Sequence, residues 1–141
     1  MEFFPFPRTL GGRQRETAML IDLEQTNFDE LIRSAGIALI DCWAPWCGAC
    51  KEFTPIFEAA SQRHPDHVFA KLNTHENDEL TKHLKVSHIP TIILFRDGLL
   101  LLRQPGHLTA AEIDEVIGKA ESIDMDQVRS DMEAREQSTT S

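Results

Sequence analysis

Two cysteines three positions apart, Cys47 and Cys50, are the residues of this 141-residue chain best suited to chemistry. The Cys-x-x-Cys spacing is the tightest at which two thiols commonly form a reversible disulfide. The pair follows an apolar stretch over residues 38–43 that reads as a buried strand, and it opens a sequence typical of a helix. The free N–H groups and dipole of a helix N-terminus favour the thiolate form of the first cysteine. The motif therefore predicts thiol–disulfide exchange.

A zinc site is the alternative use of such a pair. Structural zinc needs four ligands, usually supplied by two pairs of this kind. The chain has no second Cys-x-x-Cys, and none of its six histidines lies beside the motif. We therefore expect no metal. The third cysteine, Cys42, is expected to be a buried, inert thiol, with a regulatory disulfide to Cys47 as the alternative.

Composition and charge exclude several classes of protein. The formal net charge of −9 argues against nucleic acid or an anionic membrane as a partner, because both require basic patches. No segment approaches the roughly 20 apolar residues of a membrane helix, and the first residues are a poor secretory signal. Three cysteines are too few for a disulfide scaffold. We expect a cytoplasmic protein, with the monomer favoured.

Strand-like and helix-like segments alternate along the chain. Strands are expected over residues 20–23, 37–43, 68–72, 91–95 and 99–103. Helices are expected from a Thr26 or Asn27 cap to Ser34, over 47–63, over 77–84 and from the capping box at Thr109. The order βαβαβαββα predicts an α/β fold with a central mixed sheet flanked by helices, in which a hairpin at Asp97-Gly98 adds an antiparallel edge.

The two ends of the chain differ from the patterned middle. Residues 1–18 are expected to be a flexible N-terminal extension, read either as an artefact of translation starting at Met19 or as an arm that docks its phenylalanines. Residues 122–141 form a polar tail, expected to be mostly mobile, with Met125, Val128 and Met132 on one face of a short helix as the alternative. One face of the Leu99–Leu102 run is expected to be exposed, or covered by one of these ends, a partner or a second copy.

A resemblance to a known family rests on several separated motifs. The segment from Asp41 to Lys51, Asp-Cys-Trp-Ala-Pro-Trp-Cys-Gly-Ala-Cys-Lys, closely resembles the active-site segment of thioredoxins. The later Ile89-Pro90-Thr91 resembles the cis-proline loop of the same family, and Gly106 and the order of elements also fit. The likeness covers roughly residues 19–121, which implies one thioredoxin domain with the thioredoxin fold.

The resemblance implies a role for each catalytic residue. Cys47 is the nucleophile that attacks a substrate disulfide, and Cys50 is the resolving thiol. Asp41 relays protons to or from the resolving cysteine, and its burial should raise its pKa toward the working range. Lys71 matches the lysine that lies near this aspartate and tunes it; a lysine that extends from the strand to solvent is the alternative.

The resemblance also implies a substrate-binding surface around the disulfide. The Ile89–Pro90 bond should be cis and face Cys47, with the backbone of Ile89 pairing with an extended substrate. Trp46 should cover one side of the disulfide, whereas Trp43 should pack in the core. The remaining residues of this surface are Gly48, Ala49, Thr91 and Gly106.

Two positions depart from the family pattern. Ala49 stands where proline is usual, which returns an N–H to the helix terminus, and we expect a somewhat more oxidising couple as a result. His88 stands beside the cis-proline loop where a small residue is common. A histidine there either tunes Cys47 and partner choice or simply faces solvent.

The function that these residues favour is that of a protein-disulfide reductase and thiol–disulfide exchange carrier. The resemblance implies no tightly bound cofactor beyond the reversible Cys47–Cys50 disulfide, and recharging by an NADPH-dependent thioredoxin reductase. A thioredoxin-fold chaperone or assembly module with incidental redox activity is the alternative, motivated by the extensions and the Leu99–Leu102 run. A third reading, an oxidant or isomerase, requires an oxidising compartment.

Overall fold

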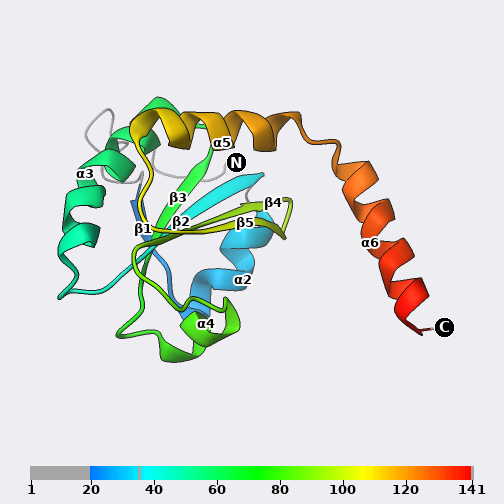
Figure 1. Ribbon diagram of the computed structural model, residues 1–141, viewed down its shortest axis with the longest axis horizontal. Helices are drawn as coiled ribbons and strands as arrows, with labels where there is room; N and C mark the ends of the chain where they lie inside the picture. Colours follow the sequence, from blue (N-terminus) through cyan, green and yellow to red (C-terminus); the bar gives the residue numbers. More distant parts are fainter. Residues whose placement is uncertain (1–19, 35, 141) are drawn as a thin grey trace, which may run out of the picture.

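A computed structural model of the chain describes residues 20–34 and 36–140, with side chains described through residue 136 (Figure 1). The expected N-terminal extension over residues 1–18, and both readings of it, lie outside the described residues.

Five strands form one mixed sheet in the described part of the chain. In sheet order they are β1 (Leu20–Asp22), β3 (Val68–Asn73), β2 (Ile37–Trp43), β4 (Thr91–Arg96) and β5 (Leu99–Pro105). The first three strands in this order run parallel, whereas β4 and β5 pair antiparallel. The sheet is therefore mixed, with a parallel part built by crossovers and an antiparallel hairpin at one edge, as the sequence predicts.

Helices cover both faces of this sheet. They are α2 (Gln25–Ser34), α3 (Gly48–Arg63), α4 (Asp78–His83), α5 (Ala110–Ser122) and α6 (Met125–Thr140). Figure 1 shows α3 and α5 over one face, α2 and α4 over the other, and α6 extending away from the sheet beyond α5. No described helix has the length and apolar character needed to cross a membrane.

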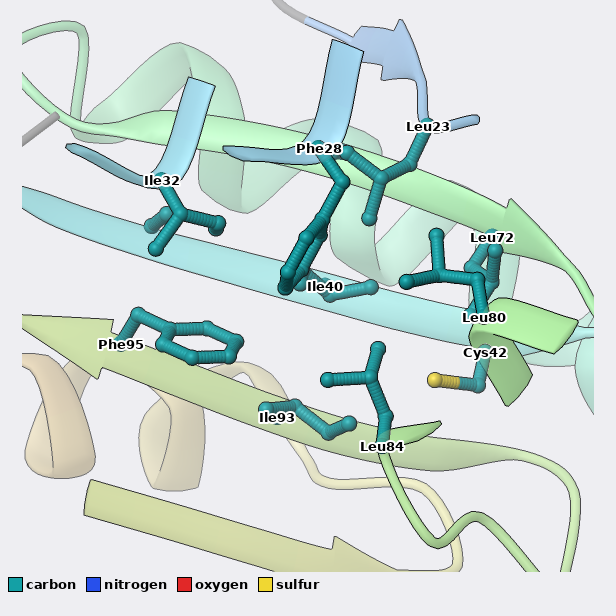
Figure 2. Packing of buried hydrophobic residues seen from close by; sticks show 12 residues of the cluster. Leu23, Phe28, Ile32, Ile40, Cys42, Leu72, Leu80, Leu84, Ile93 and Phe95 are labelled. Carbon is teal, nitrogen blue, oxygen red and sulfur yellow. The ribbon is translucent and has the colours of Figure 1, made fainter. Parts of the chain in front are cut away.

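The central strand β2 is buried on both faces, and its alternating side chains divide the core in two. Ile37 and Leu39 pack with side chains from α3 and α5. Ile40 and Cys42 pack with Phe28 and other side chains from the α2 and α4 side (Figure 2). The near-continuous apolar run of β2 fits this position, because the side chains on both faces of a covered strand are buried away from water.

Local side-chain chemistry sets where two helices begin. The Thr109 hydroxyl accepts from the Glu112 N–H at 3.1 Å while the Glu112 carboxylate accepts from the Thr109 N–H at 2.9 Å, which confirms the predicted capping box of α5. The predicted start of α2 is wrong, because α2 begins at Gln25 and contains Thr26 and Asn27. The Asn27 side chain caps from inside the first turn, accepting from the Glu24 N–H at 2.8 Å.

The C-terminal segment contains a helix over most of its length. Met125 at the start of α6 is buried, and Arg129 pairs with Asp97 of the β4–β5 turn at 3.4 Å. Val128 and Met132 line a groove with Leu99–Leu101 of the edge strand β5. The Met-bearing segment therefore lies beside the leucine run, where Leu100 is 36% exposed.

Candidate active site

The two cysteines lie where β2 passes into α3. Cys47 is the N-cap residue, with extended backbone angles of φ −90° and ψ 111°, and α3 begins at the next residue. Its sulfur accepts a hydrogen bond from the Cys50 N–H at 3.1 Å. A backbone donor of the first helical turn thus points at the Cys47 sulfur, an arrangement that favours negative charge on this sulfur when the disulfide is reduced.

Cys47 and Cys50 form a disulfide, with their Cα atoms 5.2 Å apart. The two sulfurs have different access to solvent, since Cys47 is half-buried and Cys50 is only 1% exposed. An incoming protein can therefore reach Cys47, whereas Cys50 can react with little except its neighbour.

Asp41 is the charged group buried beneath this helix. It lies on the same face of β2 as Leu39, toward α3, and it is fully buried. Neither carboxylate oxygen has a hydrogen-bond partner among the described residues. Burial raises the pKa of Asp41 from 3.8 to about 7, against a smaller lowering effect of the Lys71 charge. The predicted rise of this pKa is confirmed, and it leaves Asp41 able to take or give a proton near neutrality.

Lys71 lies directly opposite Asp41 in the register of β3 and β2. Its ammonium donates a hydrogen bond to Thr54 Oγ1 at 3.1 Å and sits 4.9 Å from the centre of the Trp43 ring. These contacts hold the lysine under α3 instead of letting it extend to solvent. Thr54 was not singled out from the sequence; its position four residues after Cys50 is the signal that places it near the site.

The Ile89–Pro90 peptide bond is cis, as the resemblance implied. Thr91 pairs with Cys42 of β2, so the loop that precedes it reaches the end of β2 where the disulfide lies. Gly106 donates its N–H to the Pro90 carbonyl at 2.7 Å and has a φ of +86°, which glycine adopts without strain. The structure thus brings Pro90, Thr91 and Gly106 together at this end of the sheet.

Trp46 precedes Cys47 in the chain, and its side chain is 67% exposed. Its ring contacts His75 edge to face, with ring centres 4.8 Å apart. The sequence does not predict a role for His75. This residue follows β3, and no motif connects it with Trp46 or the cysteine pair. Gly48 and Ala49, which follow in the chain, are also exposed. His88 is exposed as well, and its ring forms a hydrogen bond with the Ser87 hydroxyl.

Cys42 takes no part in this constellation. It is a fully buried free thiol in the cluster on the α2 and α4 side (Figure 2). Burial raises the pKa of the Cys42 thiol, and the nearby Asp41 carboxyl adds to the rise. The thiol is therefore inert, as expected. Within the described part of the chain, no group of three or more His, Cys, Asp or Glu residues is arranged to hold a metal.

Comparisons with known proteins agree with this geometry. The family model described as Thioredoxin matches residues 19–119. The chain is 41% identical over 109 residues to a putative thioredoxin 2 of Streptomyces coelicolor, covering 77% of this chain and 81% of that protein. It is 37% identical over 100 residues to a thioredoxin of Alicyclobacillus acidocaldarius, covering 67% of this chain and 95% of that one.

Solved structures show the same fold. A mutant thioredoxin from Halobacterium salinarum superposes with a TM-score of 0.71 at 25% identity, covering 76% of this chain and 95% of the other. The five-stranded mixed sheet with helices on both faces is therefore the thioredoxin fold. A family match over most of the chain, together with the dithiol at the start of α3, means that the chain belongs to the thioredoxin family and is a thioredoxin-type thiol–disulfide oxidoreductase.

Proposed function

We propose that the protein works in the reducing direction, as a protein-disulfide reductase in which Cys47 attacks and Cys50 resolves. The observation that carries the roles of the two cysteines is the unequal access of their sulfurs. Cys47 is half-buried at the N-cap of α3, and Cys50 is 1% exposed one turn deeper. Only the more accessible sulfur can meet a disulfide held by another protein.

The first step is attack by the Cys47 thiolate on one sulfur of the substrate disulfide. A bond forms between Cys47 Sγ and that sulfur, the substrate S–S bond breaks, and the other substrate sulfur leaves as a thiolate that takes a proton. The Cys50 N–H and the dipole of α3 favour the thiolate of Cys47 before the attack.

The second step regenerates the disulfide of the protein. Cys50 gives its thiol proton to the Asp41 carboxylate, and its sulfur attacks Cys47 Sγ. The Cys47–Cys50 bond forms, the bond from Cys47 to the substrate breaks, and the second substrate sulfur leaves as a thiolate that takes a proton. The dithiol has then lost two electrons and the substrate has gained them. A carboxyl with a pKa of about 7 suits this transfer, because both of its protonation states are populated at neutral pH.

We further propose that substrate binds across the exposed Trp46, Gly48 and Ala49 and along the cis-proline loop. The Ile89 backbone would pair with an extended substrate segment there, since it lies beside Pro90 at the same end of the sheet as the disulfide. Thr91 and Gly106 support this loop rather than contact the sulfurs, because their hydrogen bonds run to His88 and Pro90.

The partners that follow are disulfide-containing substrate proteins and a thioredoxin reductase. No bound cofactor is needed, because the electrons are stored in the dithiol and supplied by NADPH through the reductase. We place this cycle in the cytoplasm, where NADPH-driven reductants keep thiols reduced.

Insulin reduction driven by dithiothreitol tests the proposal. The wild-type protein should accelerate precipitation of the insulin chains, and Cys47→Ser should abolish the acceleration. Cys50→Ser should accumulate a mixed disulfide through Cys47, visible as an added mass. Cys42→Ala is the matched control and should keep its activity, because that thiol is buried on the other side of the sheet.

Negligible activity of the wild-type protein would overturn the reductase assignment. It would favour the alternative, in which the same surface binds peptides and redox turnover is incidental.

A further inference from the structure

A chain of hydrogen bonds joins β3 to the resolving cysteine through Thr54, a residue that the proposed cycle does not use. The Lys71 ammonium donates to Thr54 Oγ1 at 3.1 Å. The Thr54 hydroxyl in turn donates to the Cys50 carbonyl oxygen at 3.1 Å, one helical turn back along α3. A hydroxyl group can donate one hydrogen bond and accept two. Thr54 can therefore accept from Lys71 and donate to the Cys50 carbonyl at the same time.

The Lys71 ammonium is held by this bond on the side of α3. It also lies over the Trp43 ring at 4.9 Å from its centre, where the ring face attracts a cation. Asp41 lies opposite Lys71 in the strand register, yet no described group forms a hydrogen bond with either of its oxygens. The ammonium is therefore directed to a neutral hydroxyl although a buried carboxylate stands close by.

A direct ion pair between the Lys71 ammonium and the Asp41 carboxylate would change the protonation equilibrium of Asp41. An ammonium that bonds a buried carboxylate favours its ionised form strongly, and a carboxylate that stays ionised cannot return a proton near neutrality. A cation held slightly apart acts on the carboxyl only through its field. The placement of Lys71 thus decides how readily Asp41 exchanges protons.

We propose that Thr54 is a positioning residue for the resolving step: its hydroxyl holds the Lys71 ammonium away from the Asp41 carboxylate and ties it to the backbone of Cys50. This role rests on the proposed use of Asp41 as the proton acceptor from Cys50. In this role, Thr54 controls the balance between the neutral and the ionised forms of the Asp41 carboxyl.

The surroundings of Asp41 are simple enough for the effect to be measured. Lys71 from β3 is the one described charge whose field acts on it. On α3 the relevant residues are Thr54 and Cys50, and Cys50 does not titrate in the disulfide. On β4, the residue in register with Asp41 is the apolar Ile92. Cys42 on the same strand faces the opposite core cluster. Titration of the Asp41 carboxyl in the oxidised protein therefore reports the effect of the Lys71 charge on that carboxyl.

The test replaces Thr54 with valine, which keeps the shape of the side chain and removes the hydroxyl. The Asp41 carboxyl is titrated by NMR in the oxidised protein, and insulin reduction is measured against pH. Thr54→Val should lower the Asp41 pKa by about one unit or more, because the freed ammonium pairs with the carboxylate. The midpoint of the pH profile should fall by the same amount.

Two further variants separate the hydroxyl from other effects. Thr54→Ser keeps the hydroxyl and should match the wild type. Thr81→Val is the matched control: Thr81 also donates to the carbonyl four residues back, Asn77 O at 2.7 Å, but it lies in α4 on the other side of the sheet. It should leave the Asp41 pKa unchanged. If Thr54→Val does not fold, Thr54→Ala removes the same hydroxyl with less bulk.

A Lys71→Met background completes the test. It should raise the Asp41 pKa by removing the lowering charge, and Thr54→Val added to it should cause no further change. An unchanged or raised pKa in Thr54→Val, or a Thr54→Ser variant that behaves like valine, would overturn the proposal. An inactive wild-type protein would instead overturn the reductase assignment, and the NMR titration would still decide the role of Thr54.

Discussion

At the scale of single residues, the buried Asp41 affects the stability of this protein and also has a role in the proposed cycle. A core carboxyl to which no described residue donates a hydrogen bond costs free energy when it is ionised. Burial raises its pKa to about 7 in the folded protein, so the folded state binds this proton more tightly than the unfolded state does. The same shift that suits proton transfer therefore lowers stability at neutral and alkaline pH.

Asp41→Asn should stabilise the protein at pH 8 and not at pH below about 4. The wild type loses stability as pH rises from the unfolded-state pKa near 3.8 to the folded-state pKa of about 7, and the loss is complete above it. A shift of about three units corresponds to roughly 4 kcal/mol. Urea unfolding at the two pH values measures the difference, and an equal gain at both would contradict this reading.

Asp114 serves as a control, because its pKa is shifted in the direction opposite to that of Asp41. Hydrogen bonds from Arg63 and His64 hold the pKa of Asp114 below its usual range. Its contribution to stability is present above the unfolded-state pKa and is lost as pH falls through the folded-state pKa. Asp114→Asn should therefore destabilise the protein at pH 8, where Asp41→Asn stabilises it.

Among the secondary-structure elements, the end of α5 accepts hydrogen bonds from one arginine of the sheet. Arg96 at the end of β4 donates from one guanidinium nitrogen to the carbonyl oxygens of Ala120, Glu121 and Ile123. The last carbonyls of a helix have no partner within the helix, so a cation placed there satisfies them and complements the helix dipole. The helix and the sheet thus hold each other in place at the end of the sheet opposite the disulfide, where Arg96 pairs with Ile37 of β2.

Arg96→Ala should lower the free energy of unfolding by about 1.5–3 kcal/mol, the range for hydrogen bonds to charged groups. Urea unfolding at neutral pH is the measurement. Arg33→Ala is the control, because the ion pair that Arg33 makes with Asp29 at 4.0 Å is exposed, and pairs of that kind contribute little. Equal effects of the two changes would show that Arg96 is not a structural link.

Across the whole molecule, the order of strands in the sheet decides which leucines support the fold. Leu39 belongs to the central strand β2 and is fully buried between β3 and β4. Leu100 belongs to the edge strand β5 and is 36% exposed. Both leucines lie in apolar runs. The sequence predicts a buried strand for the run that contains Leu39 and one exposed face for the Leu99–Leu102 run, and the structure places Leu100 on the exposed face.

Leu39→Ala should cost about 2–5 kcal/mol of stability, because it leaves a cavity in a fully packed region. Leu100→Ala should cost less than about 1 kcal/mol, since its side chain is already partly in water. Thermal or urea unfolding of the two variants tests the contrast. A similar loss in both would mean that α6 covers β5 more completely in solution than the exposure of Leu100 indicates.

Much of the fold and the reactive pair could be predicted because these features depend on residues near each other in the chain. The apolar run of β2, the capping box at Thr109 and the cysteine spacing are local patterns, and each matches the structure. The resemblance supplied the cis bond before Pro90. The start of α2 was placed too late because the Asn27 side chain can cap from either side of the first turn.

The sequence alone predicts thiol–disulfide exchange, since two thiols at a strand–helix junction are a local feature, and the family resemblance adds the carboxyl of the preceding strand. The pKa of the Asp41 carboxyl, in contrast, depends on the folded chain. The bond from Lys71 to Thr54 and the contact of Trp46 with His75 join residues far apart in the chain. Burial and charge depend on what folding places around a group, so the Asp41 pKa of about 7 exists only once α3, β2 and β3 are packed together.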